Sequence, residues 1–370
     1  MPAPTRLRLF AADLHYPPEL AVHTALSGAI GHLAARYLVI EGAGGFLGVG
    51  EVRANIAYLT TLPEEGVAPA IVALSRALPW SMPPAELLAA LPSLAGDAPA
   101  IARAAVENAL VEGLARADGQ PVATYLGGTF RPAMPTNQCL FWGPDQRFDQ
   151  LAARYVAEGF RDLKVRIAVG DLDHDLARLR RLRERYGDTI RIAVDANGAW
   201  DGQQAARALA LLAPLDLAYV EQPTRPHDWD GFRTLLRGSP MKLMADESLA
   251  TSDDIERLAD CGPNALAHLK IAKSGGPLAL LRAARRLERA GIGLMVGQMN
   301  EGGLATAMTA HCAMALLPEH AELYGCYGLL DDRAPGVRYA GGAVVLPDAP
   351  GLGLQPELAG CSLLWDERLG

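Results

Sequence analysis

The sequence predicts an α/β protein, a modified (β/α) barrel of the TIM type that carries an α+β capping domain. Short apolar runs rich in β-branched residues recur about every 25–30 residues through the middle of the chain, the length of one strand-plus-helix unit. The residues before and after that region follow a different pattern. The length of 370 residues also exceeds the roughly 200–250 residues of a barrel alone.

The barrel prediction depends on eight such runs. In chain order they are NQCLFW, RDLKVRI, IRIAVDAN, LAYVEQP, MKLMADE, LAHLKIAK, IGLMVGQM and AELYG. Segments between them, such as DLDHDLARLRRLRERYG and PLALLRAARRLERAG, have apolar residues at helical spacing and charges on the other face. Eight strands alternating with helices indicate a closed parallel barrel, whose chemistry lies at the carboxyl ends of the strands.

The two ends of the chain predict a second unit. The first part contains the probable strands RLRLFAADL and ARYLVIEG, a turn-rich GAGGFLGVGE and then Ala/Leu-rich helices. The tail, with VRYAGGAVVLPDAPGLGL, has strand and turn signals but no further strand-plus-helix unit. We expect a capping domain over residues 1–130, a barrel over 131–325, and a segment 326–370 that returns to the capping domain.

Charge and composition exclude several classes of function. The net charge of −8 and the absence of a Lys/Arg run argue against a nucleic-acid partner. The five cysteines have no CxxC spacing, which indicates reduced thiols rather than a disulfide or zinc framework. The start MPAPTRLRLFAADLH has no signal-peptide-like apolar run, and no stretch is long enough to span a membrane. We therefore expect a soluble, cytoplasmic protein.

Acidic residues follow three consecutive predicted strands. Asp195 lies in VDANG, Glu221 in VEQP, and Asp246 and Glu247 in ADES. Neighbouring strands lie about 4.8 Å apart, so these carboxylates can converge on one point, where a hard cation such as Mg²⁺ would remove their repulsion. A single acidic residue at a strand end is more often a helix cap, but three in register favour a metal. Because alternation points neighbours apart, one of Asp246 and Glu247 is expected to ligate and the other to support it.

Cationic residues flank these carboxylates. Lys164 and Arg166 are two apart on one strand and share a face, which we expect to be the barrel lumen. Lys270 lies on the strand after the acidic ones, and a nearby divalent cation would lower its pKa enough for it to act as a base. Pairing with the acidic ring is the alternative for Lys270. Lys273 has the opposite parity and is expected at the surface or in support.

Two further glutamates could supply a proton or a hydrogen bond. Glu301 comes just past the seventh predicted strand and Glu322 lies at the eighth, where a structural role is an equal alternative. The eight histidines show no HxxH-like spacing, so a histidine metal site is not expected. Tyr16 and His23 become relevant if their loop covers the barrel.

The order of the motifs resembles that of the enolase superfamily, and within it the muconate-lactonising group. The resemblance covers nearly the whole chain, and its motifs are ELAVHT, LKVR, VDANGAW, VEQP, MADES, LKIAKSGGP, AGIGLMVGQMNEGG, ELYG and APGLGL. It implies a capping domain formed by both chain ends over a modified barrel. It also implies Mg²⁺, or Mn²⁺, that stabilises the enediolate left when a base removes the proton α to a carboxylate.

The resemblance assigns roles to individual residues. It implies Asp195, Glu221 and Glu247 as metal ligands and Lys270 as the acid/base on one face of the substrate. Asn197 and Asp246 are expected to support the ligands. Residues expected at the substrate are Tyr16, His23, Trp142, Gln298 and Glu322. A symmetric homo-oligomer is the family habit.

One departure affects the expected reaction. The family usually has Lys-X-Lys on the second barrel strand, whereas here the second position is Arg166, a poor general base that can still bind a carboxylate. Elimination of water or cycloisomerisation of a small carboxylate is therefore the leading hypothesis, with Lys270 as base and Glu301 as partner acid. The alternatives are a racemase or epimerase of an amino-acid derivative, in which Lys164 takes over as the second base, and a non-catalytic carboxylate-binding barrel.

Overall fold

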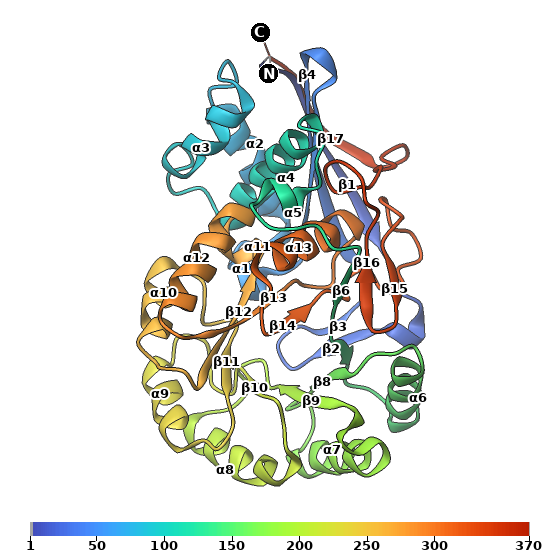
Figure 1. Cartoon of the computed structure of the whole chain (residues 1–370), viewed down its shortest axis with the longest axis vertical. Helices are drawn as coiled ribbons and strands as arrows, with labels where there is room; N and C mark the ends of the chain where they lie inside the picture. The colour runs from blue at the N-terminus through green and yellow to red at the C-terminus, as the bar shows by residue number, and fades with distance from the viewer. Residues whose placement is uncertain (1–2, 370) are drawn as a thin grey trace.

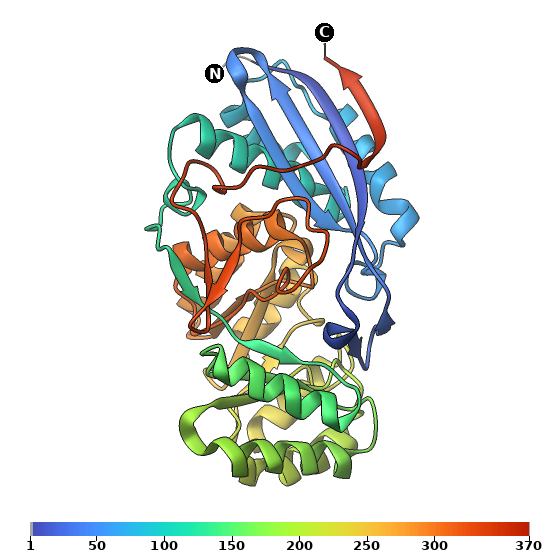
Figure 2. The same ribbon diagram turned by 90° about the vertical axis from the view of Figure 1, so that its right-hand side faces the viewer.

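The computed structural model describes residues 3–369 and shows two packed parts. Figure 1 places a sheet-and-helix part at the top, with both chain ends, above a barrel whose strands are surrounded by helices. Figure 2 shows the long strands of the upper part above the barrel part.

The lower part is an almost closed eight-stranded parallel barrel in which strand order follows chain order from β7 to β14. Its strands are β7 (Gln138–Leu140), β8 (Asp162–Arg166), β9 (Arg191–Asp195), β10 (Val220–Glu221), β11 (Leu243–Ala245), β12 (Ala265–Lys270), β13 (Gly293–Gly297) and β14 (His320–Glu322). At the seam between the last and first strands, the backbone N–H of Asn137 donates to the carbonyl of Ala321 at 3.0 Å. Each predicted run thus overlaps one strand, and the predicted fold class is confirmed.

Helices cover the outside of the barrel (Figure 1). They are α6 (Asp145–Ala157), α7 (Leu172–Tyr186), α8 (Gly202–Leu212), α9 (Trp229–Gly238), α10 (Ser252–Ala259), α11 (Ile271–Ser274), α12 (Pro277–Arg289) and α13 (Gly303–Leu316). Capping side chains define several starts; the Asp201 carboxylate, for example, accepts from the N–H groups of Gln203 and Gln204 at the start of α8.

Strand alternation separates an apolar layer from a charged layer inside the barrel. The apolar layer is a buried cluster of its own, made of Ala193, Tyr219, Met244, Leu266 and Met295. The side chains two positions further along these strands point the same way, and on four of the five strands they are polar or charged. The charged layer therefore lies above an apolar plug, toward the carboxyl ends of the strands.

The upper part combines an antiparallel sheet with helices. Its strands, in the order β17-β1-β4-β5, are β17 (Ser362–Arg368), β1 (Pro4–Leu14), β4 (Leu33–Gly42) and β5 (Leu47–Arg53). Its main helices are α2 (Glu64–Ala77), α3 (Pro84–Leu94) and α4 (Ala100–Ala117), with the short α1 (Ala57–Thr60) and α5 (Val122–Tyr125). The C-terminal segment returns to this part, since β17 pairs with β1.

Two small sheets connect the parts. The hairpin of β2 (Val22–Thr24) and β3 (Gly28–Ile30) extends from the capping domain toward the barrel (Figures 1 and 2). β15 (Arg338–Ala340) pairs with β16 (Ala343–Val345), which pairs with β6 (Ala133–Pro135).

Close contact between α4 and β5 requires glycine. A Cβ atom on Gly48 would lie 2.1 Å from the carbonyl oxygen of Ala109, and one on Gly50 would lie 2.4 Å from that of Ala105. The segment GAGGFLGVGE is therefore a turn only in its first half. The expectation of turns throughout is wrong for the second half, because its glycines serve helix packing on a strand.

Within residues 3–369, none of the helices combines the length and the apolarity that a membrane span requires. All five cysteines are free thiols.

We expect Gly48→Ala to lower the free energy of unfolding by about 2–3 kcal/mol or more, because the added methyl group meets a backbone carbonyl that cannot move without shifting α4. Urea unfolding measures the change. Gly202→Ala is the control, since a Cβ there meets nothing within 4 Å. Equal stability of both variants would contradict the packing argument.

Candidate active site

A cleft lies between the capping domain and the carboxyl ends of the barrel strands. Its upper wall includes Val22 and Thr24 of β2 and Tyr58 of α1. Its lower wall carries polar and charged side chains predicted for the site, namely Arg166, Asn197, Asp246, Glu247 and Lys270. The loop around β2 therefore does cover the barrel.

Two of the carboxylates are direct neighbours across adjacent strands. Asp195 and Glu221 are register partners on β9 and β10, and both are fully buried. Burial raises the pKa of Asp195 to about 6 against the opposing charge of Arg166, and it also raises the pKa of Glu221. Two buried carboxyls so close together favour either protonation or a bound cation.

Asn197 connects the first carboxylate to the last. Its backbone N–H donates to Asp195 Oδ1 at 2.8 Å, and its side-chain Nδ2 donates to Glu247 Oε1 at 3.0 Å. Its φ of 46° is in the left-handed region, which asparagine adopts more readily than most residues, and Gly198 follows at φ 70°. The Asn-Gly of VDANG is thus explained by a turn that holds two carboxylates in place.

Glu247 has an oxygen with no partner in the structure. Its Oε2 is buried and without a hydrogen-bond donor. Burial, followed by the charges of Asp246 and Asp195, raises the pKa of Glu247 to about 8. An unpartnered buried carboxylate oxygen beside further carboxylates fits the oxygen donor set that hard divalent cations prefer.

A second grouping of possible ligands includes a histidine. In the described chain, the one set of at least three His, Cys, Asp or Glu residues whose ligand atoms lie within 4.8 Å of one another is Glu221, Asp246 and His268. His268 Nδ1 lies 2.8 Å from Glu221 Oε1, and burial holds the pKa of His268 well below its ordinary value. The sequence did not predict His268, although it is two residues before Lys270 on β12 and so shares its inward face.

Asp246 also points inward, because it is two residues beyond the plug residue Met244. Asp246 is therefore an alternative to Glu247 as the third carboxylate. Its oxygens are already engaged by Lys270 Nζ and by Lys273 Nζ, the latter at 2.6 Å. Lys273 is buried at 6 % exposure, so the surface location considered for it is wrong and the supporting one fits.

Lys164 is enclosed by acids. Its ammonium lies 3.0 Å from Glu221 Oε2 and 3.7 Å from Asp195 Oδ2, and it also pairs with Glu322. Burial alone would lower the pKa of Lys164, but Glu221 and Glu322 outweigh burial and hold it above its ordinary value. Glu322 in turn has its pKa lowered to about 2, against the effect of burial, chiefly by Lys164. The structure therefore places Glu322 below the cleft as the partner of Lys164.

Arg166 is held in one orientation by four side chains. The guanidinium pairs with Asp195, and its Nε lies 3.3 Å from Cys139 Sγ. Its Nη2 lies 3.4 Å from the Tyr324 hydroxyl, and its Cζ lies 5.8 Å from the centre of the Phe141 ring. A buried, charged fork at the cleft wall can bind a carboxylate but cannot accept a proton.

Lys270 lies in the cleft beside Asp246. Burial would lower the pKa of Lys270, but Asp246 and then Glu221 raise it above its ordinary value. These two carboxylates thus favour the ammonium form of Lys270, in contrast to the neutral amine expected from the sequence. A divalent cation held by the neighbouring carboxylates would act in the opposite direction.

The match to known families decides the identity of the chain. Residues 147–359 match the family model described as "Enolase C-terminal domain-like", which is more than half of the chain. The chain belongs to the enolase superfamily. Muconate cycloisomerase 1 of Pseudomonas putida is 32% identical over 347 residues, covering 91% of each chain. The L-Ala-D/L-Glu epimerase of Bacillus subtilis (strain 168) is 29% identical over 271 residues, covering 72% of this chain and 73% of that protein.

A solved structure agrees with this assignment. The muconate lactonizing enzyme from Pseudomonas fluorescens complexed with muconolactone superimposes with a TM-score of 0.90 at 29% identity, covering 98% of this chain and 99% of that one. This enolase-superfamily member is thus muconate-cycloisomerase-like, and its chemistry is the metal-dependent removal of a proton α to a carboxylate.

The remaining predicted substrate contacts divide into two groups. Gln298 lines the cleft, and the hydroxyl of Tyr16 accepts from Nδ2 of the cleft residue Asn300 at 2.9 Å. His23 and Trp142 instead pack against each other at 5.0 Å between ring centres. The residues next to His23 and Trp142 in the sequence line the wall of this enolase-superfamily cleft instead. Successive side chains of an extended segment point to opposite sides.

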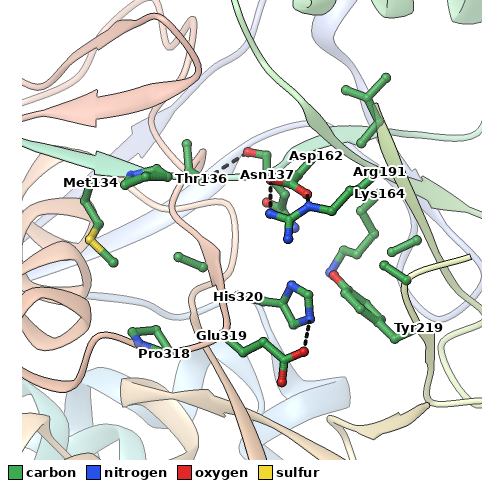
Figure 3. A pocket seen from close by; sticks show the side chains of 15 residues that line it. Met134, Thr136, Asn137, Asp162, Lys164, Arg191, Tyr219, Pro318, Glu319 and His320 are labelled. Carbon is green, nitrogen blue, oxygen red and sulfur yellow. Dashed lines mark hydrogen bonds and ion pairs between the residues drawn. The ribbon is translucent and has the colours of Figure 1, made fainter. Parts of the chain in front are cut away.

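A second cavity in the barrel lies at the wrong end for this chemistry. It has a volume of about 240 Å³ and opens at the seam between β7 and β14, at the amino ends of the strands (Figure 3). Figure 3 shows Lys164 and Tyr219 on one side of it and the His320–Glu319 pair on another. Barrel enzymes react at the opposite end, where this superfamily member has its carboxylates.

We expect Glu221→Gln to weaken metal binding by at least about tenfold, roughly 1.4 kcal/mol. Glu221 is the one residue that both groupings of possible ligands share, and the substitution removes its charged oxygen donor. The rise in melting temperature with added Mg²⁺ or Mn²⁺ measures it. Glu112→Gln, which removes a buried carboxylate of the capping domain, controls for the loss of buried charge. Unchanged metal affinity in Glu221→Gln would exclude it as a ligand.

Proposed function

We propose that the enzyme is a lyase or cycloisomerase of a small carboxylate that uses one base, Lys270. One observation carries the proposal: Lys270 and Arg166 both line the cleft, so the side that could hold a second base carries a guanidinium instead. Proton removal from one face is sufficient for elimination of water or for cycloisomerisation, whereas racemisation requires a base on each face.

The proposed cofactor is Mg²⁺, with Mn²⁺ as the alternative. Asp195 and Glu221 are the first two proposed ligands, Glu247 is the expected third, and Asp246 competes with it for the reasons given above. When bound, the cation would offset negative charge that develops on the substrate carboxylate.

The proposed roles of the protein side chains follow from their positions. Arg166 orients the substrate carboxylate. Lys164 lies below the cleft, and its positive charge favours the ionised form of the surrounding carboxylates. Lys270 must first lose a proton, which Asp246 disfavours, and then takes the α-proton at Nζ. Glu301, buried at 7 % exposure and with a pKa raised to about 7 by burial, is the proposed partner acid.

An epimerase acting on an amino-acid derivative is the second candidate, because relatives with this activity align over most of the chain. It would require Lys164 to act as the second base. Lys164 is fully buried and bonded to Glu221 and Glu322, which argues against that role. A carboxylate-binding barrel without turnover is the third candidate. We also propose a homo-oligomer in the cytoplasm, which agrees with free thiols.

Lys270→Met is expected to abolish turnover without weakening metal binding, because it removes the base but no proposed ligand. Proton NMR in D₂O with Mg²⁺ would screen unsaturated diacids, sugar acids and amino-acid derivatives against wild type and variant side by side. Net loss of water or ring closure that occurs in wild type but not in Lys270→Met supports the proposal. Exchange of the α-proton with change of configuration would instead identify an epimerase. Silence with metal bound would mean either that the library lacks the substrate or that the site has lost turnover.

Arg166→Lys should introduce a second base and so allow epimerisation of a chiral substrate identified in that screen. We expect inversion at the α-carbon at least about a hundredfold above wild type, the contribution typical of a positioned general base. Chiral chromatography of the recovered substrate measures it. Cys139→Ser is the control, since it alters a contact of Arg166 without adding a base. Equal inversion in wild type would contradict the one-base proposal.

A further inference from the structure

The loop after β13 is held by the capping domain on both sides of Glu301. Arg53, the last residue of β5, donates from Nη1 to the carbonyl of Asn300 at 3.2 Å. Glu51 of the same strand accepts from the backbone N–H of Gly302 at 2.8 Å. The two residues that flank Glu301 are thus both bonded to one strand of the capping sheet.

Arg53 is a buried cation without an ion pair. It is 2 % exposed, and across residues 3–369 it forms no ion pair with a carboxylate within 4.0 Å. Its remaining bonds are to Asn55, at 2.7 Å from Nε to Oδ1 and 3.4 Å from Nη2 to the carbonyl. A buried charge costs several kcal/mol of folding free energy unless another charge compensates it. The buried guanidinium of Arg53 therefore calls for a functional reason.

Glu301 lies between the two positions that the capping strand holds, Asn300 and Gly302. Its carboxylate has one hydrogen bond, 3.3 Å from the backbone N–H of Met299 in its own loop. Among the charges that face it, Arg53 acts most strongly to favour the ionised form, with Lys270 of β12 second. Glu51 opposes them, and Asp332 lies next to Glu51.

We propose that Arg53 is a positioning residue for Glu301: it fixes the loop through Asn300 and places a buried positive charge opposite the Glu301 carboxyl. The inference depends on the proposed role of Glu301 as partner acid. When Glu301 gives its O–H proton to the substrate, a carboxylate is left in a water-poor site, and the guanidinium of Arg53 stabilises that anion. The capping domain therefore completes the acid side of the site as well as covering it.

The test is a titration that needs no substrate. Full-length protein with Mg²⁺ is labelled with ¹³C at the glutamate side-chain carboxyl, and the Glu301 resonance is the one lost in Glu301→Gln. Arg53→Met should raise the midpoint of its titration by about one pH unit, because an opposing charge is removed. Arg53→Lys keeps the charge and should restore most of the wild-type midpoint.

Arg36→Met is the matched control, since Arg36 is a largely buried arginine on the adjacent strand β4 that pairs with Glu64. It should leave the Glu301 midpoint unchanged. An unchanged midpoint in folded Arg53→Met overturns the proposal, as does an equal shift in Arg36→Met, which would indicate a general loosening of the capping domain. If Arg53→Met does not fold, the Glu301 midpoint is compared between Arg53→Lys and Arg53→Gln. Only Arg53→Gln removes the charge, so only this variant should raise the midpoint.

The outcome is distinguishable from failure of the proposed function. If Glu301→Gln retains turnover but the Arg53 variants still shift the midpoint, Arg53 governs Glu301 and Glu301 is not the acid. If Glu301→Gln loses turnover and the midpoint does not move, Glu301 is the acid and Arg53 is structural.

Discussion

Charge compensation inside the barrel is the constraint on which the rest of the site depends. Five buried carboxylates and four buried cations share one layer, namely Asp195, Glu221, Asp246, Glu247, Glu322, Lys164, Arg166, Lys270 and Lys273. Such a layer is tolerable only where the charges neutralise one another or a bound cation. The apolar plug below and the capping domain above keep water away, which strengthens every interaction in the layer. The same enclosure makes the excess of negative charge a driving force for binding a cation.

This constraint also bears on Arg166, the residue on which the proposed one-base reaction depends. Arg166 supplies the positive charge that the layer needs at that position, so the change from lysine preserves the electrostatic balance while removing a base. The flanking Cys139, Phe141 and Tyr324 accommodate the longer guanidinium. The electrostatic balance of the layer therefore requires a positive charge at this position but not a base.

The sequence could predict the barrel and the approximate site because both depend on local periodicity. Strand length and alternation place Asp195 and Glu221 at strand ends, and parity alone would have placed His268 inward. The choice between Asp246 and Glu247 could not be made in this way, because both lie just beyond β11 and both reach the charged layer: Asp246 pairs with Lys270 and Lys273, and Glu247 accepts from Asn197. Contacts such as that of Arg53 with Asn300 join residues 247 positions apart and leave no local signal.

The placement of β17 has a consequence for synthesis of the chain. β1 is an inner strand of the capping sheet, yet its partner on one side, β17, is synthesised only after all eight barrel strands. Until then one edge of β1 has unpaired backbone groups, a surface that can pair with other extended chains. The barrel can assemble during translation while this sheet stays incomplete. Deletion of β17 would thus leave a folded barrel beneath an open sheet edge, and such a product would be prone to self-association.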